Sequence, residues 1–391
     1  MDIQPSRHGH VSWVELYFDL VFVFAVGQLA HLIVVHPGWP AVLLALGLFA
    51  TLWWTWIGFV VLYNRHGEDR ATERLFMLAG TVPCAIAAVE ARAAAEGDLA
   101  GFALALAGTR LVLAVAYPVS ARSGLGVGRR AGFGYAVSTV LFLVSVALST
   151  PWIYLLWIVT LAQEASFLLL AARPGRRRRW GQALPGHEFA VNARHLSERF
   201  NLFMIIMMGE VVISVSSTAA DVSTRNKEYW LGLVAGLVLA GALWWIYFDS
   251  AAYINEYMLD ASGGNATLAY GIYAGGYLLP TFALLVISAG CGLSLQEQPP
   301  PTAVWLVTVG LAAYLVGVRS FVAGRRGRRI HLLRVVVIAL TVSIALLDRV
   351  LIGPVAVAAA AVWAVIVAAT ITRRSTVDRS TGPAGVTEPS R

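Results

Sequence analysis

Long apolar segments, separated by short stretches rich in Pro, Gly and charged residues, follow one another along most of the chain. A helix needs roughly 20 apolar residues to cross a bilayer, and the pattern predicts about twelve such helices. The predicted spans are residues 12–35, 41–62, 75–92, 99–118, 132–149, 152–171, 198–219, 229–250, 267–290, 302–323, 331–347 and 350–371. The expected fold is an all-α, polytopic bundle whose main partner is the lipid bilayer.

Composition agrees with this pattern. The chain is 58% hydrophobic and 13% charged, whereas a soluble domain is roughly 45–50% apolar and about 25% charged. The basic residues lie in short loops beside apolar spans, where they act as topology signals, so no nucleic-acid partner is expected. The two cysteines lie in apolar segments, without a CxxC or His-rich cluster. We therefore expect no disulfide framework, metal site or cofactor.

Arginines gather in every second loop, for example at residues 173–179 and 325–329. The positive-inside rule then places both termini in the cytoplasm. Glu15 and Asp19 interrupt the first apolar segment and no small-residue cleavage site follows, so this segment is expected to be an uncleaved span. Residues 374–391 are rich in Ser, Thr, Gly, Pro and charges, which is typical of a disordered tail.

Short motifs of the first half recur in the second half in the same order. The paired motifs are residues 18–28 and 200–210, 52–54 and 243–245, 79–83 and 274–280, and 108–110 and 317–319. The pattern predicts a duplication, with one six-helix repeat in residues 1–180 and another in residues 181–373. Because each repeat has an even number of spans, the two are expected to be parallel and related by a pseudo-twofold axis.

Polar and ionisable residues inside the predicted spans are the candidate functional residues. A charge at the centre of a bilayer costs at least about 2.5–3.5 kcal/mol on insertion scales, so it is retained for a partner or a task. The candidates for a substrate or ion pathway are Glu15, Asp19, Gln28, Arg110, Glu164, Glu198, Arg199, Asn201, Glu210 and Asp249.

Glu15 and Asp19 are four residues apart and share one helix face. Two acids this close repel unless one is protonated or a cation lies between them. They form either a cation or proton site near the cytoplasmic mouth, or a pair of acids bound to arginines of neighbouring spans. Gln28 and His31, further along the span, could extend them into a polar stripe, but a lone histidine near a helix end is more often a satisfied interfacial residue.

Glu210 lies among methionines and valines near the middle of its span, which makes it a strong functional candidate. Arg110 is the expected partner of Glu210, and Glu164 is another deep acid. Buried arginines paired with acids are alternatively only a means of holding helices together.

Glu198 is expected to cap the start of the seventh span and to pair with His195 or Arg199. Asp249, together with Asn255 and Glu256, is expected to close the cytoplasmic end of the bundle.

Two segments resemble signatures of a known family. The motif SWVELYFDLVFVFA at residues 12–25 is similar to the opening signature of the bacterial low temperature requirement A family. The motif HLSERFNLF at 195–203, followed by Gly209 and Glu210, resembles its second signature, in which histidine or glycine is as frequent as Asn201. The resemblance runs from about residue 8 to 370 and implies a bacterial multi-pass inner-membrane protein. The family name records a growth phenotype in the cold and implies no defined reaction.

A fainter resemblance links residues 19–22 to the lysosomal potassium and proton channels, which have two six-helix repeats and a Phe-Ser-Asp signature. The serine is missing here, and Asn201 replaces the acid in the second half. The selectivity chemistry of those channels therefore does not carry over to this chain.

The leading hypothesis is translocation of an ion or small solute through a path between the two repeats. Asp19 and Glu210 would bind or relay a cation, and Arg110 would set their charge. The alternative is an integral membrane enzyme acting on a lipid or isoprenoid, with Glu15, Asp19 and Glu198 as acid and base groups; common enzyme motifs such as HExxH and GxSxG are absent. A cold-responsive structural or sensory protein is a third hypothesis. The sequence leaves open whether the protein forms a homo-oligomer.

Overall fold

The computed structural model describes residues 11–66, 70–121, 125–172, 192–222, 224–262, 265–319, 328–346 and 353–380. All regular secondary structure in these ranges is helical, which confirms the all-α class. The arginine-rich loop at 173–179 and the tail residues 381–391 lie outside the described residues.

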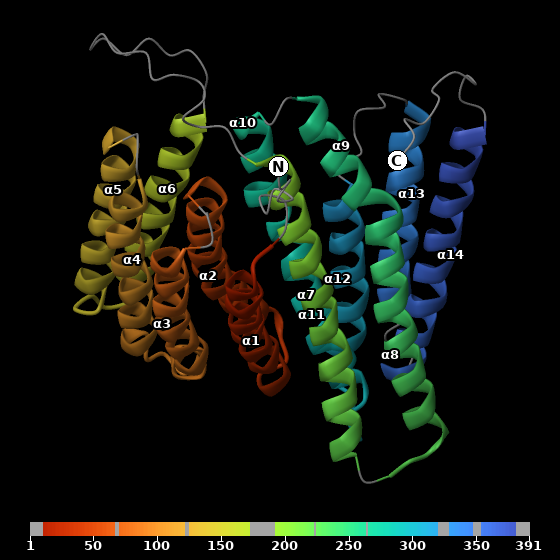
Figure 1. Ribbon diagram of the computed structural model, residues 1–391. Helices are drawn as coiled ribbons and strands as arrows, with labels where there is room; N and C mark the ends of the chain where they lie inside the picture. Colours follow the sequence, from red (N-terminus) through yellow and green to blue (C-terminus); the bar gives the residue numbers. More distant parts are fainter. Residues whose placement is uncertain are drawn as a thin grey trace.

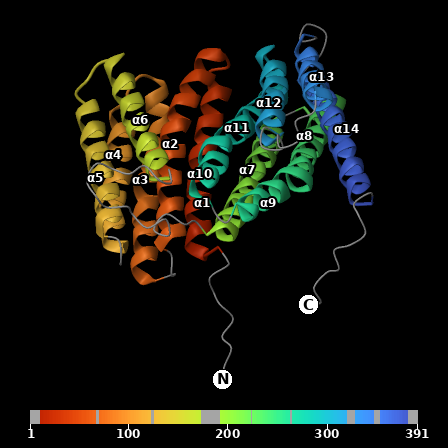
Figure 2. The same ribbon diagram turned by 90° about the horizontal axis from the view of Figure 1, so that it is seen from above.

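The helices form two groups that stand side by side (Figure 1). The first group is α1 (Trp13–Val35), α2 (Trp39–His66), α3 (Ala71–Ala95), α4 (Ala100–Ser120), α5 (Leu125–Ser145) and α6 (Trp152–Ala172). The second is α7 (Ala193–Asp221), α8 (Lys227–Ile246), η2 (Tyr247–Ala252), α9 (Tyr253–Ala261), α10 (Ala266–Ala269), η3 (Tyr270–Gly276), α11 (Leu278–Ser294), α12 (Thr302–Arg319), α13 (Arg328–Ala345) and α14 (Gly353–Ser380). The groups meet in the middle, where α1 and α2 contact α7 and α11 (Figure 2).

Eight helical segments of the described chain are long and apolar enough to cross a membrane. They are Trp13–Val35, Trp39–Arg65, Ala71–Ala95, Ala100–Ser120, Arg194–Ala220, Lys227–Leu259, Tyr270–Ser294 and Gly353–Thr372. Two shorter apolar helices, Thr302–Val318 and Val335–Ala345, accompany them. The protein is thus a membrane-type helical bundle, while a count of twelve spans stays a prediction.

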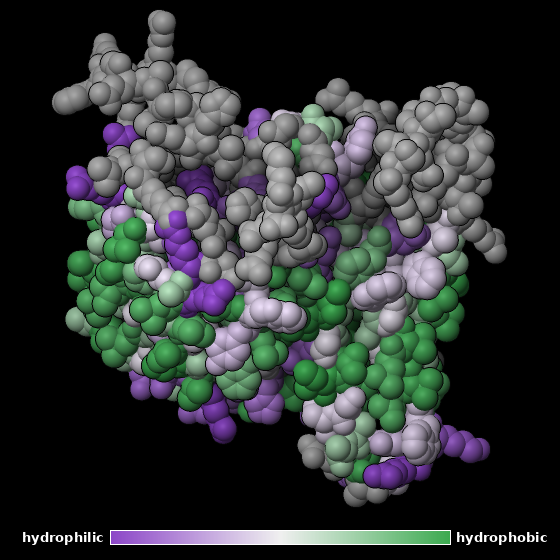
Figure 3. Space-filling model, in the orientation of Figure 1, coloured by the Kyte–Doolittle hydropathy of each residue, from purple (hydrophilic) through white to green (hydrophobic). Residues whose placement is uncertain are grey.

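Large apolar side chains face outward from several helices. Leu43 is 67% exposed, Leu75 65% and Phe133 72%. Hydrophobic residues cover much of the middle of the face in Figure 3, and hydrophilic residues gather toward its upper and lower ends. A surface of this kind is unfavourable in water and fits a bundle whose sides contact lipid.

The two groups share one packing feature. Helix α3 packs on α4 in the first group, and α11 packs on α12 in the second. A Cβ atom added at Gly108 of α4 would lie 3.1 Å from Pro83 of α3. A Cβ added at Gly317 of α12 would lie 2.6 Å from Pro280 of α11. In both groups a glycine thus allows a neighbouring helix to approach closely at a proline.

Two details differ from the prediction. The π-helical segments η2 and η3 interrupt the predicted spans 229–250 and 267–290, and the apolar pattern carries no signal for them. Helix α14 continues to Ser380, past residue 374 where the tail is predicted to start.

Candidate functional site

The starts of α1 and α7 place ionisable side chains toward each other. Asn192 caps α7, with its side-chain oxygen accepting a hydrogen bond from the His195 backbone N–H at 3.1 Å. His195 and Arg199 are therefore one turn apart on the same face of α7. Glu15 of α1 accepts a hydrogen bond from the Ser12 backbone N–H at 3.0 Å. The same spacing of four residues places Asp19 beside Glu15.

Glu15, Asp19, His195 and Arg199 form a buried group that we call the acid–arginine cluster. Arg199 Nη1 lies 2.7 Å from Glu15 Oε1, and Nη2 lies 2.9 Å from Asp19 Oδ1. His195 Nε2 lies 3.1 Å from Glu15 Oε2. Arg199 and both acids are fully buried, and His195 is 8% exposed. This geometry is that of the second interpretation above, in which an arginine of another helix pairs with both acids.

Two side chains of α2 complete the cluster. Trp56 Nε1 donates a hydrogen bond to Asp19 Oδ1 at 2.7 Å. The Asn64 amide nitrogen lies 3.3 Å from His195 Nδ1 and donates to the Asn192 backbone oxygen at 3.1 Å. An amide donor at Nδ1 assigns the proton of a neutral His195 to Nε2, which then donates to Glu15. With two acids and one arginine, the cluster carries a net charge of −1 in this state.

The cluster keeps two polar atoms without a hydrogen-bond partner in the described part of the chain: Asp19 Oδ2 and Arg199 Nε. Buried polar atoms of this kind are rare in folded proteins and mark either strain or a place for a further ligand.

A layer of aromatic rings lies directly beside the cluster. It consists of Phe22, Trp53, Trp56, Phe200 and Phe203, all fully buried. The ring centroids of Trp56 and Phe203 are 4.2 Å apart, and those of Phe22 and Phe203 are 5.7 Å apart. This aromatic layer closes the interface between α1, α2 and α7 on one side of the cluster.

Glu210 lies further along α7, about 16 Å from Arg199 at the rise of an α-helix. Its carboxylate lies against Gly27 of α1, because a Cβ added at Gly27 would come 3.0 Å from Glu210 Oε1. The side chain is half-buried. No described residue forms an ion pair or hydrogen bond with this carboxylate. Among the predicted acids, Glu210 is thus the one at the α1–α7 interface that Arg199 does not reach.

Arg110 pairs with Glu164 rather than with Glu210, so the predicted partner was wrong. Arg110 Nε and Nη2 lie 3.1 Å from Glu164 Oε1 and Oε2, respectively. Arg110 also donates to Thr55, and it lies over the Phe142 ring at 4.9 Å. The pair is buried inside the first group of helices. The packing of α6 near α4, which residue spacing alone does not reveal, brings the two together.

Asn201 lies in a neutral chain of hydrogen bonds. Tyr247 Oη donates to Asn201 Oδ1 at 2.8 Å and lies 2.7 Å from Tyr277 Oη. The Asn255 amide donates to Tyr277 Oη at 3.1 Å. The sequence patterns did not single out Tyr247 or Tyr277. One available signal was the predicted repeat, because Tyr247 follows Trp244 and Trp245 as Trp56 follows Trp53 and Trp54.

The other candidates have different surroundings from those predicted. Asp249 accepts a hydrogen bond from Thr372 of α14 at 2.7 Å, so it joins η2 to α14. Asn192 rather than Glu198 caps α7, and Glu198 is half-buried. Gln28 is half-buried, but nine residues place it about half a turn away from Asp19 around α1, so no polar stripe forms.

Within the described ranges, no group of three or more His, Cys, Asp or Glu side chains is arranged to hold a metal ion.

Long apolar helices around buried, ion-paired side chains define a multi-pass helical membrane protein. Residues 10–370 match the family described as bacterial low temperature requirement A protein (LtrA), and the chain belongs to this family. The match confirms the resemblance seen in the two signatures. The chain is also similar to an uncharacterized protein of Rhizobium meliloti (strain 1021), with 25% identity over 295 residues that cover 73% of this chain and 70% of that protein.

Proposed function

We propose that this LtrA-family protein moves a small cation, in the simplest case a proton, across the membrane along the interface of α1 and α7. The acid–arginine cluster carries the proposal. Four ionisable side chains are buried where the two groups of helices meet. A buried ion pair adds little stability over well-packed apolar residues of similar volume, so packing alone gives little reason to retain one.

The charge of the cluster supports a cation as the transported species. With neutral His195 the net charge is −1, and one added proton brings it to zero. Asp19 Oδ2, which has no partner among the described residues, offers a second place for a proton or cation.

Glu210 supplies a second acid along the same interface. The aromatic layer borders the cluster on α1, α2 and α7, and Glu210 lies further along α7 against Gly27. In the proposed cycle, a cation leaves the cluster when the aromatic layer opens and is then received by the Glu210 carboxylate. Arg199, in place of Arg110, sets the charge of the acids.

We also propose that the bundle is a duplication with twelve spans, and that the path lies between the repeats. Two pairs of contacts support this. A proline lies against a glycine at matching positions of both halves. Trp56 donates to Asp19, and Tyr247 donates to Asn201. Asp19 and Asn201 are equivalent in the predicted repeat, as are Trp56 and Tyr247.

Residues 1–180 and 181–373 are the proposed repeats. The arginine-rich loops and the family support a location in the bacterial inner membrane with both termini in the cytoplasm.

The enzyme hypothesis has weaker support. It assigned acid and base roles to Glu15, Asp19 and Glu198. The first two of these carboxylates are fully buried, so a lipid substrate has no exposed carboxylate to contact there.

Cation flux into liposomes tests the proposal. The purified protein is reconstituted and flux of H⁺, K⁺ and Na⁺ is compared for the wild type, Asp19→Asn and Glu210→Gln. We expect at least about a tenfold loss of flux in both variants, equivalent to about 1.4 kcal/mol in the barrier. Glu96→Gln is the matched control, because Glu96 is 64% exposed beside Arg92.

Two outcomes would contradict the proposal. If the folded wild-type protein conducted none of the three cations, cation transport would be ruled out as its function. Normal flux in both variants would leave a transporter whose path avoids these acids.

A further inference from the structure

Asn64 joins the end of α2 to the start of α7 through both ends of its side-chain amide. Its Oδ1 accepts a hydrogen bond from the Asn192 backbone N–H at 3.2 Å, and its Nδ2 donates to the Asn192 backbone oxygen at 3.1 Å. A backbone N–H only donates and a backbone oxygen only accepts, so these bonds fix which end of the amide is oxygen. The second N–H of Nδ2 remains for His195 Nδ1, 3.3 Å away. We call Asn64, the Asn192 backbone and His195 the α2–α7 latch.

The α2–α7 latch accepts His195 only in its neutral form. A neutral imidazole donates from one ring nitrogen and accepts at the other, whereas a protonated imidazole donates from both. In the closed latch Asn64 donates to Nδ1, and Nε2 lies 3.1 Å from Glu15 Oε2, to which it donates. A proton on Nδ1 would place two donors against each other. Turning the Asn64 amide over would not remove the conflict, because both bonds to the Asn192 backbone would then be lost.

The latch lies at the side of the acid–arginine cluster that is nearest to water. The spans of α2 and α7 end at Arg65 and begin at Arg194, next to Asn64 and His195 in the chain. Asn192 is exposed and Asn64 is half-buried. His195 is 8% exposed, whereas the other three members of the cluster are fully buried. His195 is therefore the member that a proton from water meets first, and Asn64 covers its Nδ1.

A proton on His195 changes its contacts on both sides of the ring. The ionisable groups on the turns beside His195 are Glu15 and Asp19 of α1, Tyr63 of α2, and Glu198 and Arg199 of α7. Tyr63 stacks on the His195 ring with centroids 6.3 Å apart. Glu15 contacts Nε2 directly, so a protonated His195 forms an ion pair with it. Uptake of a proton thus breaks the latch at Nδ1 and strengthens the contact with α1 at Nε2.

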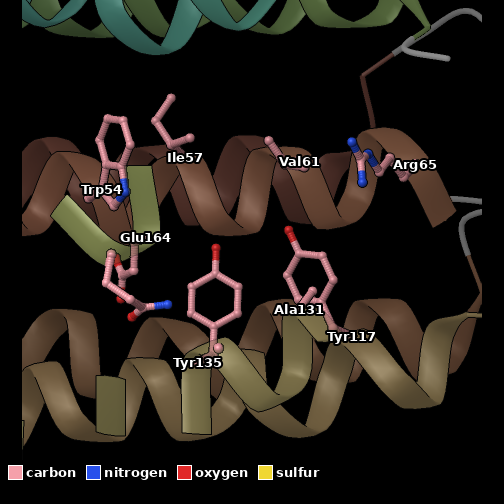
Figure 4. A pocket seen from close by; sticks show the side chains of 10 residues that line it. Trp54, Ile57, Val61, Arg65, Tyr117, Ala131, Tyr135 and Glu164 are labelled. Atoms are coloured by element: carbon pink, nitrogen blue, oxygen red, sulfur yellow. The ribbon is translucent and has the colours of Figure 1, made fainter. Parts of the chain in front are cut away.

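The end of α2 is the fixed side of the latch. Tyr117 Oη of α4 donates to the Gly58 backbone oxygen at 3.1 Å. Tyr117 also lines a cavity of about 30 Å³ on this side of α2, which has room for little more than a water, so the packing there is close (Figure 4). Arg65 donates to Tyr270 of η3 at 2.6 Å. These contacts do not depend on Asn64, so Asn192 is the side of the latch that can separate.

We propose that protonation of His195 opens the α2–α7 latch. While His195 is neutral, Asn64 holds the Asn192 backbone and covers Nδ1. When Nδ1 takes up a proton, Asn64 releases Asn192 and the start of α7 separates from α2. Asn64 is thus a positioning residue that acts through His195. The role of the latch as a gate between water and the acid–arginine cluster rests on the proposed function, whereas its hydrogen-bond chemistry does not.

Backbone hydrogen exchange at Asn192 tests the opening in the wild-type protein without any substitution. This N–H donates to Asn64 in the closed latch. After correction for the intrinsic pH dependence of exchange, it should exchange at least about tenfold faster at about pH 5 than at about pH 8. The Tyr229 N–H, bound by the Asn226 side chain at the start of α8, is the internal control and should show no such difference. Equal corrected rates at Asn192 would overturn the switch.

Nitrogen-15 NMR of histidine-labelled protein in liposomes tests the tautomer. At about pH 8 the wild-type His195 signal, assigned by its absence in His195→Gln, should show an unprotonated Nδ1 and a protonated Nε2. Asn64→Asp replaces the N–H donor by an acceptor and should place a proton on Nδ1 at the same pH. Asn226→Asp is the matched control, because it adds a carboxylate at the start of α8. A protonated Nδ1 in the wild type, or no change in Asn64→Asp, would contradict the latch.

The pH profile of cation flux separates the latch from the proposed function. Asn64→Leu removes the latch, so the pH of half-maximal flux should move by at least about one unit, whereas a purely structural defect lowers flux at every pH. Thermal melting in detergent checks that the variant folds. An unshifted profile in folded Asn64→Leu would rule out the gating role. A wild type with the expected exchange and tautomer but no flux would contradict cation transport and still support the latch.

Discussion

The two halves of the protein make the same contact with different charge. In the first half Trp56 donates to the carboxylate of Asp19, and in the second half Tyr247 donates to the amide oxygen of Asn201. The distances are 2.7 and 2.8 Å. Only the first of these acceptors is paired with a cation, and that cation is Arg199 from the second half. The comparison shows that the same hydrogen-bond arrangement can be part of a charged cluster in one half and join neutral side chains in the other.

The last helix of each half shows the same contrast. Helix α6 is held to α4 by two charge-assisted hydrogen bonds between Glu164 and Arg110. Helix α14 is held to η2 by a hydrogen bond from the Thr372 hydroxyl to Asp249. Charged pairs thus fasten the first half internally, whereas a hydroxyl donor fastens the second.

The largest effect is expected for Arg199→Gln, which removes the positive charge that pairs with Glu15 and Asp19. Two buried acids then lack an ion partner, and removing one member of a buried ion pair costs about 3–5 kcal/mol. The free energy of unfolding in detergent should fall by that amount. The exposed Arg92→Gln should change it by no more than about 0.5 kcal/mol. Similar stability of both variants would show that the acids are not ionised.

An intermediate effect is expected for the aromatic donors. Trp56→Phe removes a hydrogen bond to a carboxylate, worth about 1.5–3 kcal/mol, whereas Tyr247→Phe removes one to a neutral amide, worth about 0.5–1.5 kcal/mol. Melting in detergent should therefore show the larger loss for Trp56→Phe. Trp39→Phe, at a residue 47% exposed, controls for the loss of an indole ring. Equal losses at both donors would remove the distinction between the halves.

The smallest effect is expected for Thr372→Val. This substitution keeps the size of the side chain and removes the hydroxyl that donates to Asp249 and accepts a hydrogen bond from Trp245. Thr372 and Asp249 are only half-buried, so water can replace the lost bonds and the cost should be about 0.5–1.5 kcal/mol. Thr370→Val is the matched control, because that exposed hydroxyl bonds only to the Val367 backbone oxygen of its own helix. A melting point that is the same in both variants would show that α14 is held by packing alone.

The sequence predicted the helical class and most helix positions, because apolar length is a direct requirement of a bilayer. It also identified the buried ionisable residues, since charges stand out in an apolar segment. Glu15, Asp19, Arg199 and Glu164 are all buried as such residues should be. Most ionisable residues of the site could therefore be identified from the sequence.

The sequence did not reveal which of these residues form ion pairs with one another. Arg110 was assigned to Glu210 and is bound to Glu164. Arg199 was one of two partners considered for Glu198 and is bound to Asp19 and Glu15. Both pairings depend on which helices become neighbours and on their rotation, and one charged side chain tolerates several partners. Aromatic donors such as Trp56 were missed because membrane spans contain many aromatic residues with ordinary packing roles.

The division of the acid–arginine cluster between α1 and α7 constrains how such a chain could have evolved. Two copies of the first half would bring their acids together with no arginine between them, because Tyr17 occupies the position that matches Arg199. Two copies of the second half would lack the acids, because Ser197 and Asn201 match Glu15 and Asp19. A dimer of two identical halves, of either kind, would therefore lack part of the acid–arginine cluster. Under the proposed duplication, these substitutions would prevent a symmetric dimer of either half from being restored by single changes, so the two halves would depend on each other within one gene.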